Sequence, residues 1–344
     1  MPMPEPLAES PSLEAKVALL RRSQTWPGQP ARIEERETHM SWVFLTPDHA
    51  YKLKKPVRYD FLDFSTLELR RRDSEEEVRL NRRLAPGVYL GVVPLAVDPQ
   101  GNARIEGEGK AIEWLVKMRR LPEQCMLDTR IERGELHESD LRELAHTLAR
   151  FYRDCAKAGL DREQYRAAFA EAIEINQREL AAVDHQLPHD AVRELHRAQV
   201  DFLTHNAEEF DARVDAGHIV EGHGDLRPEH VCLNAQPLII DCLEFNREFR
   251  LVDPADELSF LALECERLGA GFAGPALFTA YGEVSGDHPP ARLLAFYRVY
   301  RACLRARLAI WHTRELSPDQ WPKWQERARE YLRLAHVHLV GLAA

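Results

Sequence analysis

The most informative part of the chain is HGDLRPEH at residues 223–230, which IIDCLEF at residues 239–245 follows. Two short apolar runs here are joined by Asn-Ala-Gln-Pro, and this pattern predicts a β-hairpin. Asp225 would lie in the loop before the first strand, and Asp241 at the end of the second strand. We therefore expect the hairpin to place two carboxylates on opposite sides of one small site.

Two carboxylates in this arrangement meet the needs of phosphoryl transfer. One of them, Asp225, can orient an attacking hydroxyl group and accept its proton. The other, Asp241, can bind the metal ion that neutralises the charge of the phosphates. An HGD tripeptide alone arises by chance in many proteins, so the interpretation also depends on the upstream sequence.

Residues 41–57, SWVFLTPDHAYKLKKPV, predict another β-hairpin, because Thr-Pro-Asp-His separates two strand-like runs. In the second strand, alternation places Lys52 and Lys54 on one face. The same alternation places Tyr51 and Leu53 on the other face. One face of this strand is therefore basic and the other is apolar.

A helix is expected at about residues 65–84, opened by a capping box of Ser65 and Glu68 and stopped by Ala-Pro-Gly. Strands should follow at residues 88–97 and 111–121, with a turn-rich hairpin between them. The order β-β-α-β-β describes a small sheet with one helix.

The rest of the chain is mostly helical in its pattern. A stripe of apolar residues at helical spacing begins at Leu141, with Ser139 or Asp140 available as the N-cap. A similar stripe, typical of a buried core, begins at Leu293. These patterns predict an α+β protein.

The predicted elements divide the chain into three parts. Residues 1–30 form a tail with a short helix, and residues 31–120 form an N-terminal lobe, to which the family resemblance described below assigns nucleotide binding. Residues 121–344 form a helical C-terminal lobe, which contains the catalytic hairpin at residues 219–245.

These motifs resemble the aminoglycoside phosphotransferase family of kinase-like enzymes. HGDLRPEHVCL is similar to that family's HGDxxxxN catalytic loop, and IIDCLEF looks like the strand with its metal-binding Asp. SWVFL, YKLKKPV and NRRLAPGVYLGVVPL resemble an uncharacterised bacterial branch of the family, and the similarity covers roughly residues 36–315. The resemblance implies a protein-kinase-like two-lobed fold, with a small antiparallel-sheet N-lobe and a mostly helical C-lobe.

The resemblance also implies roles for single residues. Asp225 matches the catalytic base, His223 a histidine of the same loop, and Asp241 the ligand of Mg²⁺. Lys52 or Lys54 would contact the α- and β-phosphates of ATP. We prefer Lys52, although the sequence does not separate the two lysines.

Other parts of the nucleotide site follow from the same resemblance. Glu77 would pair with the phosphate-binding lysine, and the hinge containing Val116 and Met118 would receive adenine through its backbone. Without this context, the lysines would be solvent-facing charges on an edge strand. Glu77 would then be part of a solvated run of three glutamates.

His230 is the main departure from the family pattern, because it stands where the family has a metal-binding Asn. Imidazole is a poor ligand for Mg²⁺, which prefers oxygen donors. Glu229 or water could bind the metal in its place, His230 could hold the loop instead, or the enzyme could prefer Mn²⁺. A weakened activity is a further alternative.

Several other charged residues have more than one interpretation. Asp253, with Asp256 close behind it, is either a helix N-cap or a brace for the catalytic loop. Glu244 either supports the site or forms a surface salt bridge. Arg227 either orders the loop or binds phosphate, or it is simply solvated.

The composition limits the possible functions. The 344 residues carry a net charge of −10, which argues against binding to nucleic acid or to an anionic membrane surface. None of the six cysteines forms a CxxC pair, and Cys232 and Cys242 are expected to be buried free thiols. This cysteine usage predicts a reduced, cytoplasmic protein. The N-terminal residues lack the pattern of a signal peptide, so we also expect the protein to be soluble.

The sequence therefore predicts an ATP-dependent phosphotransferase that acts on a hydroxyl of a small polar molecule. A catalytically weak or inactive nucleotide sensor is the alternative, and a protein kinase or nucleotidyl transferase is a third possibility. The acceptor and the oligomeric state are left open, because fold does not determine substrate.

Overall fold

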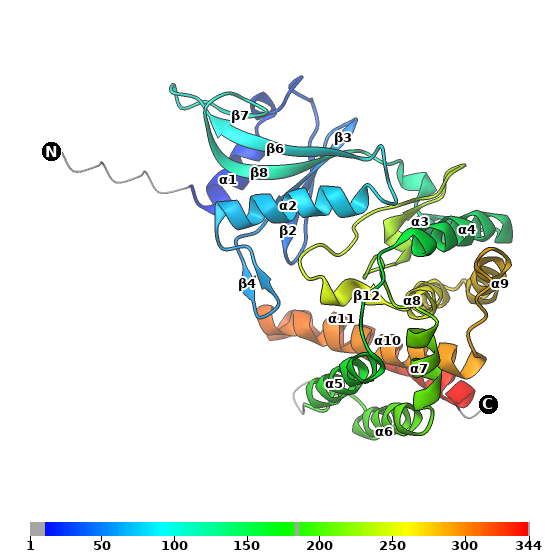
Figure 1. Ribbon diagram of the computed structural model, residues 1–344. Helices are drawn as coiled ribbons and strands as arrows, with labels where there is room; N and C mark the ends of the chain where they lie inside the picture. The colour runs from blue at the N-terminus through cyan, green and yellow to red at the C-terminus, as the bar shows by residue number, and fades with distance from the viewer. Residues whose placement is uncertain (1–10, 183–185, 343–344) are drawn as a thin grey trace. The chain divides into compact units, whose positions relative to one another are not determined.

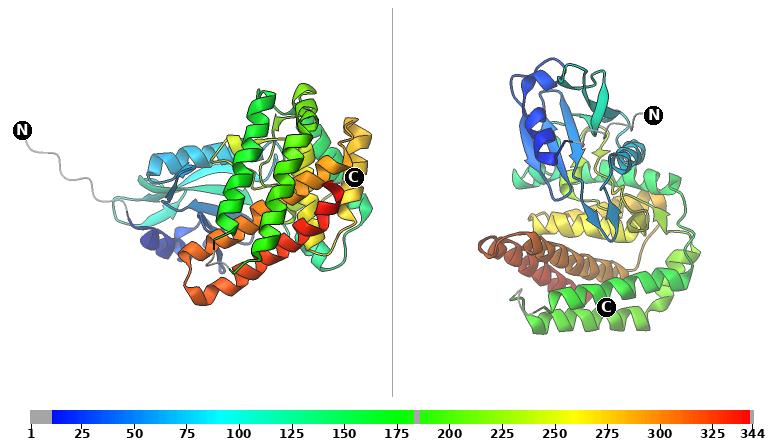
Figure 2. Two further views of the ribbon diagram at one scale, coloured as in Figure 1. Left: turned by 90° about the horizontal axis from the view of Figure 1, so that it is seen from below. Right: turned by 90° about the vertical axis from the view of Figure 1, so that its left-hand side faces the viewer.

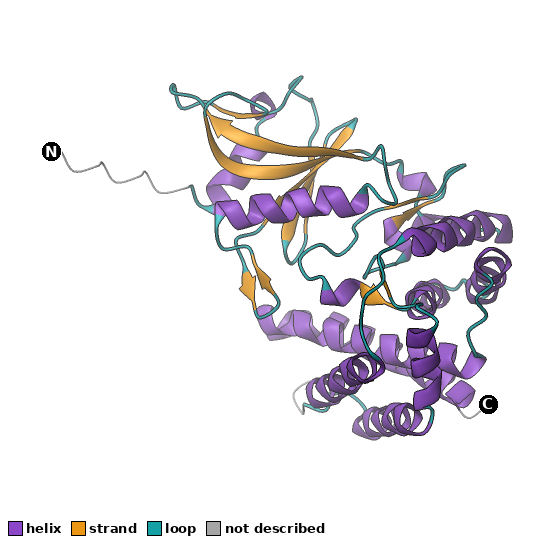
Figure 3. Ribbon diagram, in the orientation of Figure 1, coloured by secondary structure: helices purple, strands orange, loops and turns teal. Residues whose placement is uncertain are grey.

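The computed structural model describes residues 11–182 and 186–342, so the first ten residues of the predicted tail lie outside it. The chain forms two compact units. The N-terminal unit extends to Pro122 and also includes Ile239–Asn246, whereas the C-terminal unit comprises the rest. The large sheet belongs to the first unit and most helices to the second (Figure 3). The predicted α+β class is confirmed.

The N-terminal unit is built on a six-stranded antiparallel sheet with the strand order β1-β2-β3-β8-β6-β7. The predicted hairpin of residues 41–57 is present as β2 and β3. The edge strand β1 was not predicted, because its sequence EERE has no apolar residue and its side chains are mostly exposed. A two-stranded sheet accompanies the large one. The strands of this unit are β1 (Glu34–Glu37), β2 (Ser41–Leu45), β3 (His49–Lys54), β4 (Arg58–Tyr59), β5 (Leu62–Asp63), β6 (Tyr89–Val97), β7 (Ala103–Ile105) and β8 (Lys110–Arg119).

The two faces of the large sheet differ as the alternation predicts. Tyr51 and Leu53 are buried in an apolar core that also contains Trp26 and residues of α1 (Leu13–Leu20). Helix α2 (Leu67–Asn81) lies along the sheet (Figure 1) and packs against β6 and β8. Lysines of β3 reach side chains of α2, so the basic face of β3 meets this helix.

The beginning of α2 differs from the prediction. Thr66, not Ser65, is the N-cap, and its hydroxyl oxygen accepts a hydrogen bond from the N–H of Leu69. Ser65 instead donates its backbone N–H and its hydroxyl to Asp63. Two adjacent hydroxyl residues both satisfy the sequence rule, and the turn made by Asp63 selects between them.

The C-terminal unit is mostly helical. Figure 2 shows α5 and α6 near α10 and α11. Helix α10 packs against the other three, and α6 also packs against α5 and α11, around an apolar core. The helix at Leu141 begins after His137, not at the predicted Ser139 or Asp140. Asp140 still takes part, because its carboxylate accepts a hydrogen bond from the His137 backbone. The helices are α3 (Leu127–Glu132), α4 (Glu138–Asp154), α5 (Arg162–Leu180), α6 (His189–His205), α7 (Ala207–Asp215), α8 (Pro254–Arg267), α9 (Ala273–Ser285), α10 (Ala291–Trp311) and α11 (Trp321–His338).

Short strands flank the HGD motif. The predicted runs of residues 219–245 become β10 (Val231–Cys232) and β11 (Leu238–Ile239), which are shorter than expected. Two further short strands, β9 (Val220–Glu221) and β12 (Leu251–Val252), pair with each other on either side of this region. Within the described residues, no helix combines the length and apolar character that a bilayer crossing requires.

A disulfide joins Cys125 and Cys232, which corrects the expectation of a reduced chain with a free thiol at Cys232. Cys242 is a buried free thiol, as expected. Met126 and Cys232 form an antiparallel bridge, and the N–H of Leu233 donates to the carbonyl oxygen of Cys125 at 2.6 Å. This backbone pairing brings together two cysteines that are 107 residues apart, so no local spacing could indicate the bond.

The disulfide should stabilise the C-terminal unit, because a bond across a long loop restricts the unfolded chain. We expect the double variant Cys125→Ser/Cys232→Ser to lose about 2–4 kcal/mol of unfolding free energy, measured by urea denaturation. Denatured wild-type protein should take up four alkyl groups without reductant, one for each free cysteine. Alkylation of all six cysteines without reduction would contradict the bond.

Candidate active site

Two lysines of β3 meet four carboxylates within the N-terminal unit. The ammonium of Lys52 lies 3.0 Å from Glu77 Oε1 and 2.7 Å from Asp241 Oδ1. Lys54 contacts the other oxygen of Glu77 at 2.7 Å. Glu77 is completely buried, so it is not part of a solvated helix face. We call these residues the lysine–carboxylate cluster; its members are Lys52, Lys54, Asp73, Glu77, Asp241 and Glu244.

Asp241 has an unusual backbone conformation, with φ at +59°. Aspartate tolerates this left-handed region better than most residues, although the conformation still costs free energy. Two hydrogen bonds hold it: the N–H of Asp241 donates to the hydroxyl oxygen of Tyr89 at 3.0 Å, and the N–H of Cys242 donates to Asn81 Oδ1 at 2.8 Å. A non-glycine residue kept in such a conformation is often functional.

The charges of the cluster suit a divalent cation. Burial acts to lower the pKa of Lys52, but the carboxylates of Asp241 and Glu77 outweigh it and the pKa lies well above its ordinary value. Lys52 therefore stays charged. When every member is ionised, the four carboxylates and two ammonium groups give the cluster a net charge of −2.

Asp241 is the member best placed to hold a metal. Its side chain is 43% exposed, and a carboxylate oxygen is the donor that Mg²⁺ prefers. Among the residues described, no three His, Cys, Asp or Glu side chains are arranged so that together they could hold one metal ion. This is compatible with Mg²⁺, which is commonly held by one or two carboxylates together with substrate phosphates.

Val116 and Met118 lie in β8, at the centre of the large sheet. Val116 is opposite Lys52 on one side, and Met118 is opposite Ala50. Directly opposite residues of an antiparallel pair point to the same face. Both side chains therefore share the sheet face of Lys52, with β6 paired along the other edge of β8. Their contact with adenine stays a prediction.

The second group of predicted residues lies in the C-terminal unit, on the loop before β10. The carboxylate of Asp225 is 29% exposed and faces Arg227, with Nη2 to Oδ2 at 3.0 Å. Arg227 also contacts Glu229 at 2.5 Å, so it is not a freely solvated side chain. Burial acts to raise the pKa of Asp225, but the positive groups around it, Arg227 first among them, together outweigh burial and the pKa lies below its ordinary value. Asp225 is therefore an ionised hydrogen-bond acceptor.

The two histidines of this loop contact its backbone. His230 Nδ1 donates to the carbonyl oxygen of Asp225 at 2.8 Å, and its Nε2 lies 3.3 Å from a guanidinium nitrogen of Arg227. The N–H of Asp225 in turn lies 3.3 Å from His223 Nδ1. These contacts favour a loop-holding role for both rings.

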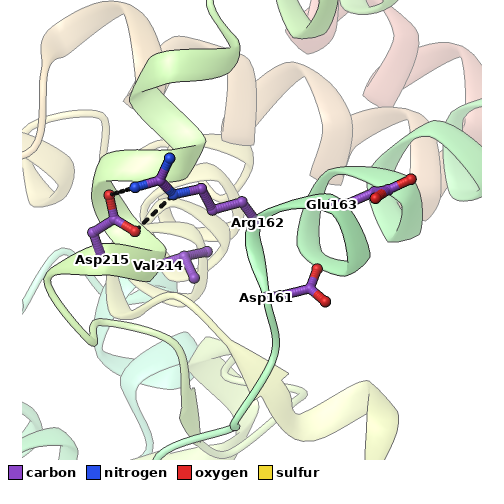
Figure 4. Close-up of a pocket in the computed structure, with 5 residues that line it drawn as sticks. All are labelled: Asp161, Arg162, Glu163, Val214 and Asp215. Carbon is purple, nitrogen blue, oxygen red and sulfur yellow. Dashed lines mark hydrogen bonds and ion pairs between the residues drawn. The ribbon is translucent and has the colours of Figure 1, made fainter.

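A surface hollow of about 440 Å³ contains none of the predicted residues. It lies between the beginning of α5 and the end of α7 (Figure 4), where the exposed side chain of Arg162 forms an ion pair with Asp215. Asp161, which also lines it, is the N-cap of α5. Arg162, Asp215 and Asp161 therefore have structural partners in this hollow.

Comparison with known proteins gives the fold. No protein-family model matches the chain. A choline/ethanolamine kinase family protein from Mesorhizobium loti aligns over 96% of this chain and 99% of its own, with a TM-score of 0.55 and 16% identity. A choline kinase from Cryptosporidium parvum aligns over 96% and 94%, with a TM-score of 0.52 and 9% identity. The chain has the protein-kinase-like fold of these proteins.

These two structures confirm the kinase-like fold that the sequence resemblance implied. An aminoglycoside phosphotransferase from Alicyclobacillus acidocaldarius aligns over 99% of this chain and 97% of its own, with 11% identity and a TM-score of 0.49. Uncharacterised proteins of Mycobacterium bovis and Mycobacterium tuberculosis are 37% identical over 279 residues, 80% of this chain and 54% of theirs. The chain thus spans about half the length of these curated relatives.

Glu257 is a residue of this kinase-like chain that the sequence analysis did not identify. Its buried carboxylate accepts hydrogen bonds from the N–H of His223 at 3.1 Å and of Gly224 at 2.5 Å. Tyr152 donates its hydroxyl to the same carboxylate at 2.7 Å. Glu257 thus holds the backbone of the HGD motif. The only signal was a pair of acidic residues, Asp256 and Glu257, in the first turn of α8.

Asp253 acts at the beginning of the same helix, α8. It is the N-cap, one of the two roles that the sequence left open, and its side chain accepts a hydrogen bond from the N–H of Ala255 at 2.8 Å. Its carboxylate also pairs with Arg213. Asp256 points elsewhere and pairs with Arg301. Asp253 therefore fixes the helix that carries Glu257, and its effect on the loop is indirect.

Proposed function

We propose that the chain is an ATP-dependent phosphotransferase that transfers the γ-phosphoryl group to a hydroxyl group of a small polar molecule. The observation that carries this proposal is Lys52, whose ammonium joins Glu77 of α2 to Asp241. A lysine held in this way can present its charge to phosphate oxygens, while Asp241 can hold a metal. The structural neighbours named as choline and ethanolamine kinases support the same class of reaction.

The C-terminal unit supplies the base in this proposal. The hydroxyl oxygen of the acceptor forms a bond to the γ-phosphorus, and the bond from that phosphorus to the β,γ-bridging oxygen breaks. The electron pair of the broken bond leaves with ADP, and the hydroxyl proton passes to the carboxylate of Asp225. Glu257, His223 and His230 keep the Asp225 loop in place.

The N-terminal unit would hold the nucleotide. Lys52 would contact the phosphates, and Val116 and Met118 would lie near adenine on the same sheet face. Asp241 would hold Mg²⁺ or Mn²⁺, which supplies positive charge to the phosphates when bound. We assign His230 to the loop and not to the metal, because its ring nitrogens already face Asp225 and Arg227.

The pH dependence of the reaction should report the Arg227–Asp225 pair. Asp225 is ionised at neutral pH because its pKa is held below the ordinary value, chiefly by Arg227 against the effect of burial. In Arg227→Gln the pKa should rise, so the acid limb of kcat/KM should move to higher pH by about one unit. The stability that ionised Asp225 contributes is present above about pH 4 and is lost as the pH falls through its folded pKa. An unchanged acid limb would show that Arg227 does not set this pKa.

The alternative is a nucleotide sensor without turnover, which the histidine at the usual Asn position favours. Two measurements separate the functions. Calorimetric titration with ATP and Mg²⁺ reports binding, and mass spectrometry of a panel of alcohols, amino alcohols and sugars reports transfer. We expect binding together with a phosphomonoester product, both lost when EDTA removes the metal. Binding without product would favour the sensor, and an adenylylated or phosphorylated protein would indicate a different reaction.

A further inference from the structure

The two lysines of β3 share Glu77 but differ in their surroundings. Lys52 contacts one oxygen of Glu77 and lies 2.7 Å from Asp241, whose side chain is well exposed. The side chain of Lys52 itself is 14% exposed. Lys54 contacts the other oxygen of Glu77 and is only 2% exposed. The open end of the lysine–carboxylate cluster is therefore at Lys52, and the closed end is at Lys54.

Three carboxylates surround the ammonium of Lys54. Asp73 and Glu77, one turn apart on α2, each have an oxygen at 2.7 Å. Glu244, which follows Asp241 in the chain, contributes a third close oxygen. The ring of Phe64 lies 5.1 Å from the same ammonium. An ammonium has three N–H groups, so a phosphate oxygen could bind Lys54 only by displacing one of these carboxylates.

The surroundings of Lys54 also keep it charged. Burial acts to lower its pKa, but Glu244, Glu77 and Asp73 together raise it above the ordinary value. Removing one partner of such a buried group leaves the remaining charges uncompensated. Through its ion pairs, the charged Lys54 attaches β3 to two separate segments, namely α2 and the residues that follow Asp241.

We propose that Lys54 is a positioning residue, which keeps Asp241 and Glu77 in place so that Lys52 can act on the nucleotide. The cluster contains two parallel connections. Lys52 joins Glu77 to Asp241, and Lys54 joins Glu77 to Glu244 three residues further along. The second connection holds the segment in which Asp241 adopts its strained backbone conformation. The role in turnover rests on the proposed function, whereas the mechanical role of Lys54 does not.

Hydrogen exchange of the free protein tests the mechanical role without nucleotide. Lys54→Met and Glu244→Gln should both speed amide exchange in Ile239–Asn246, whereas Lys52→Met should change it less. Glu244→Gln keeps a charged Lys54 between two carboxylates. It can therefore replace Lys54→Met in the exchange experiment if Lys54→Met does not fold. The matched control is Glu68→Gln, which removes an exposed ion pair of α2 with Arg72. Unchanged exchange in Glu244→Gln would overturn the proposal.

Kinetics separate a positioning role from direct phosphate binding. A displacement of about 1 Å at the reacting groups can cost about a hundredfold in rate, so kcat in Glu244→Gln should fall by up to that factor. Lys52→Met should mainly weaken ATP binding measured by calorimetry. Loss of ATP binding in Lys54→Met with normal exchange would make Lys54 a phosphate ligand and contradict the proposal. If wild-type protein neither binds nor uses ATP, the proposed function fails, and the exchange data still decide the role of Lys54.

Discussion

Replacing Asp225 with Asn is expected to lower kcat by about a thousandfold, the middle of the range for loss of a general base. The amide has nearly the shape of the carboxylate but cannot accept the hydroxyl proton. Glu257 and His223 accept hydrogen bonds from backbone N–H groups of the loop, and these bonds should persist. Binding of ATP, assigned to the N-terminal unit, should therefore be unchanged. Steady-state kinetics and calorimetric titration measure the two quantities separately.

Glu229→Gln is the matched control for this variant. It removes one negative charge from the same loop, and Glu229 shares the guanidinium of Arg227 with Asp225. Because Glu229 has no part in the proton transfer, its variant should retain most of the activity. Equal losses in both variants would mean that the loop needs negative charge in general, and the assignment of Asp225 as base would be wrong.

Removing Arg213 should have the largest effect on stability. Its buried guanidinium lies 2.7 Å from both oxygens of Asp253 and contacts Asp287 at 2.5 and 2.7 Å. Both carboxylates are buried, and tyrosine hydroxyls complete their hydrogen bonding. Arg213→Ala leaves two charges without a counterion in the interior. The expected loss of unfolding free energy is about 3–5 kcal/mol.

An exposed ion pair of the same type supplies the control. Arg162 forms two hydrogen bonds with Asp215, but both side chains are at least half exposed. Arg162→Ala should therefore cost at most about 1 kcal/mol. Urea unfolding followed by far-UV circular dichroism reports mainly on the helical C-terminal unit. Similar losses of unfolding free energy in Arg213→Ala and Arg162→Ala would contradict the stabilising role given to the buried Arg213 ion pairs.

The features that sequence could predict follow local rules. The hairpin of β2 and β3, the basic face with Lys52 and Lys54, and the N-cap at Asp253 each depend on a few neighbouring residues. The motif at Asp225 also identified its loop, because the family resemblance is concentrated in consecutive residues.

The features that sequence could not predict depend on distant contacts. Strand β1 forms because its backbone pairs with β2, not because the sequence EERE favours a strand. The bond between Cys125 and Cys232 spans 107 residues. Glu257 lies 34 residues after His223, whose backbone N–H donates a hydrogen bond to the Glu257 carboxylate. The different roles of Lys52 and Lys54 rest on which carboxylates the fold places around each.

The central claim is that this chain moves the γ-phosphoryl group of ATP to an alcohol. Its most direct test uses ATP with heavy oxygen in the γ-phosphoryl group, incubated with Mg²⁺, wild-type protein and the pooled acceptors. The account predicts a phosphomonoester that carries the label from the γ-phosphoryl group, formed by wild-type protein and not by Asp225→Asn. Label that stays in ATP, or that appears in a product equally with both proteins, would contradict the account.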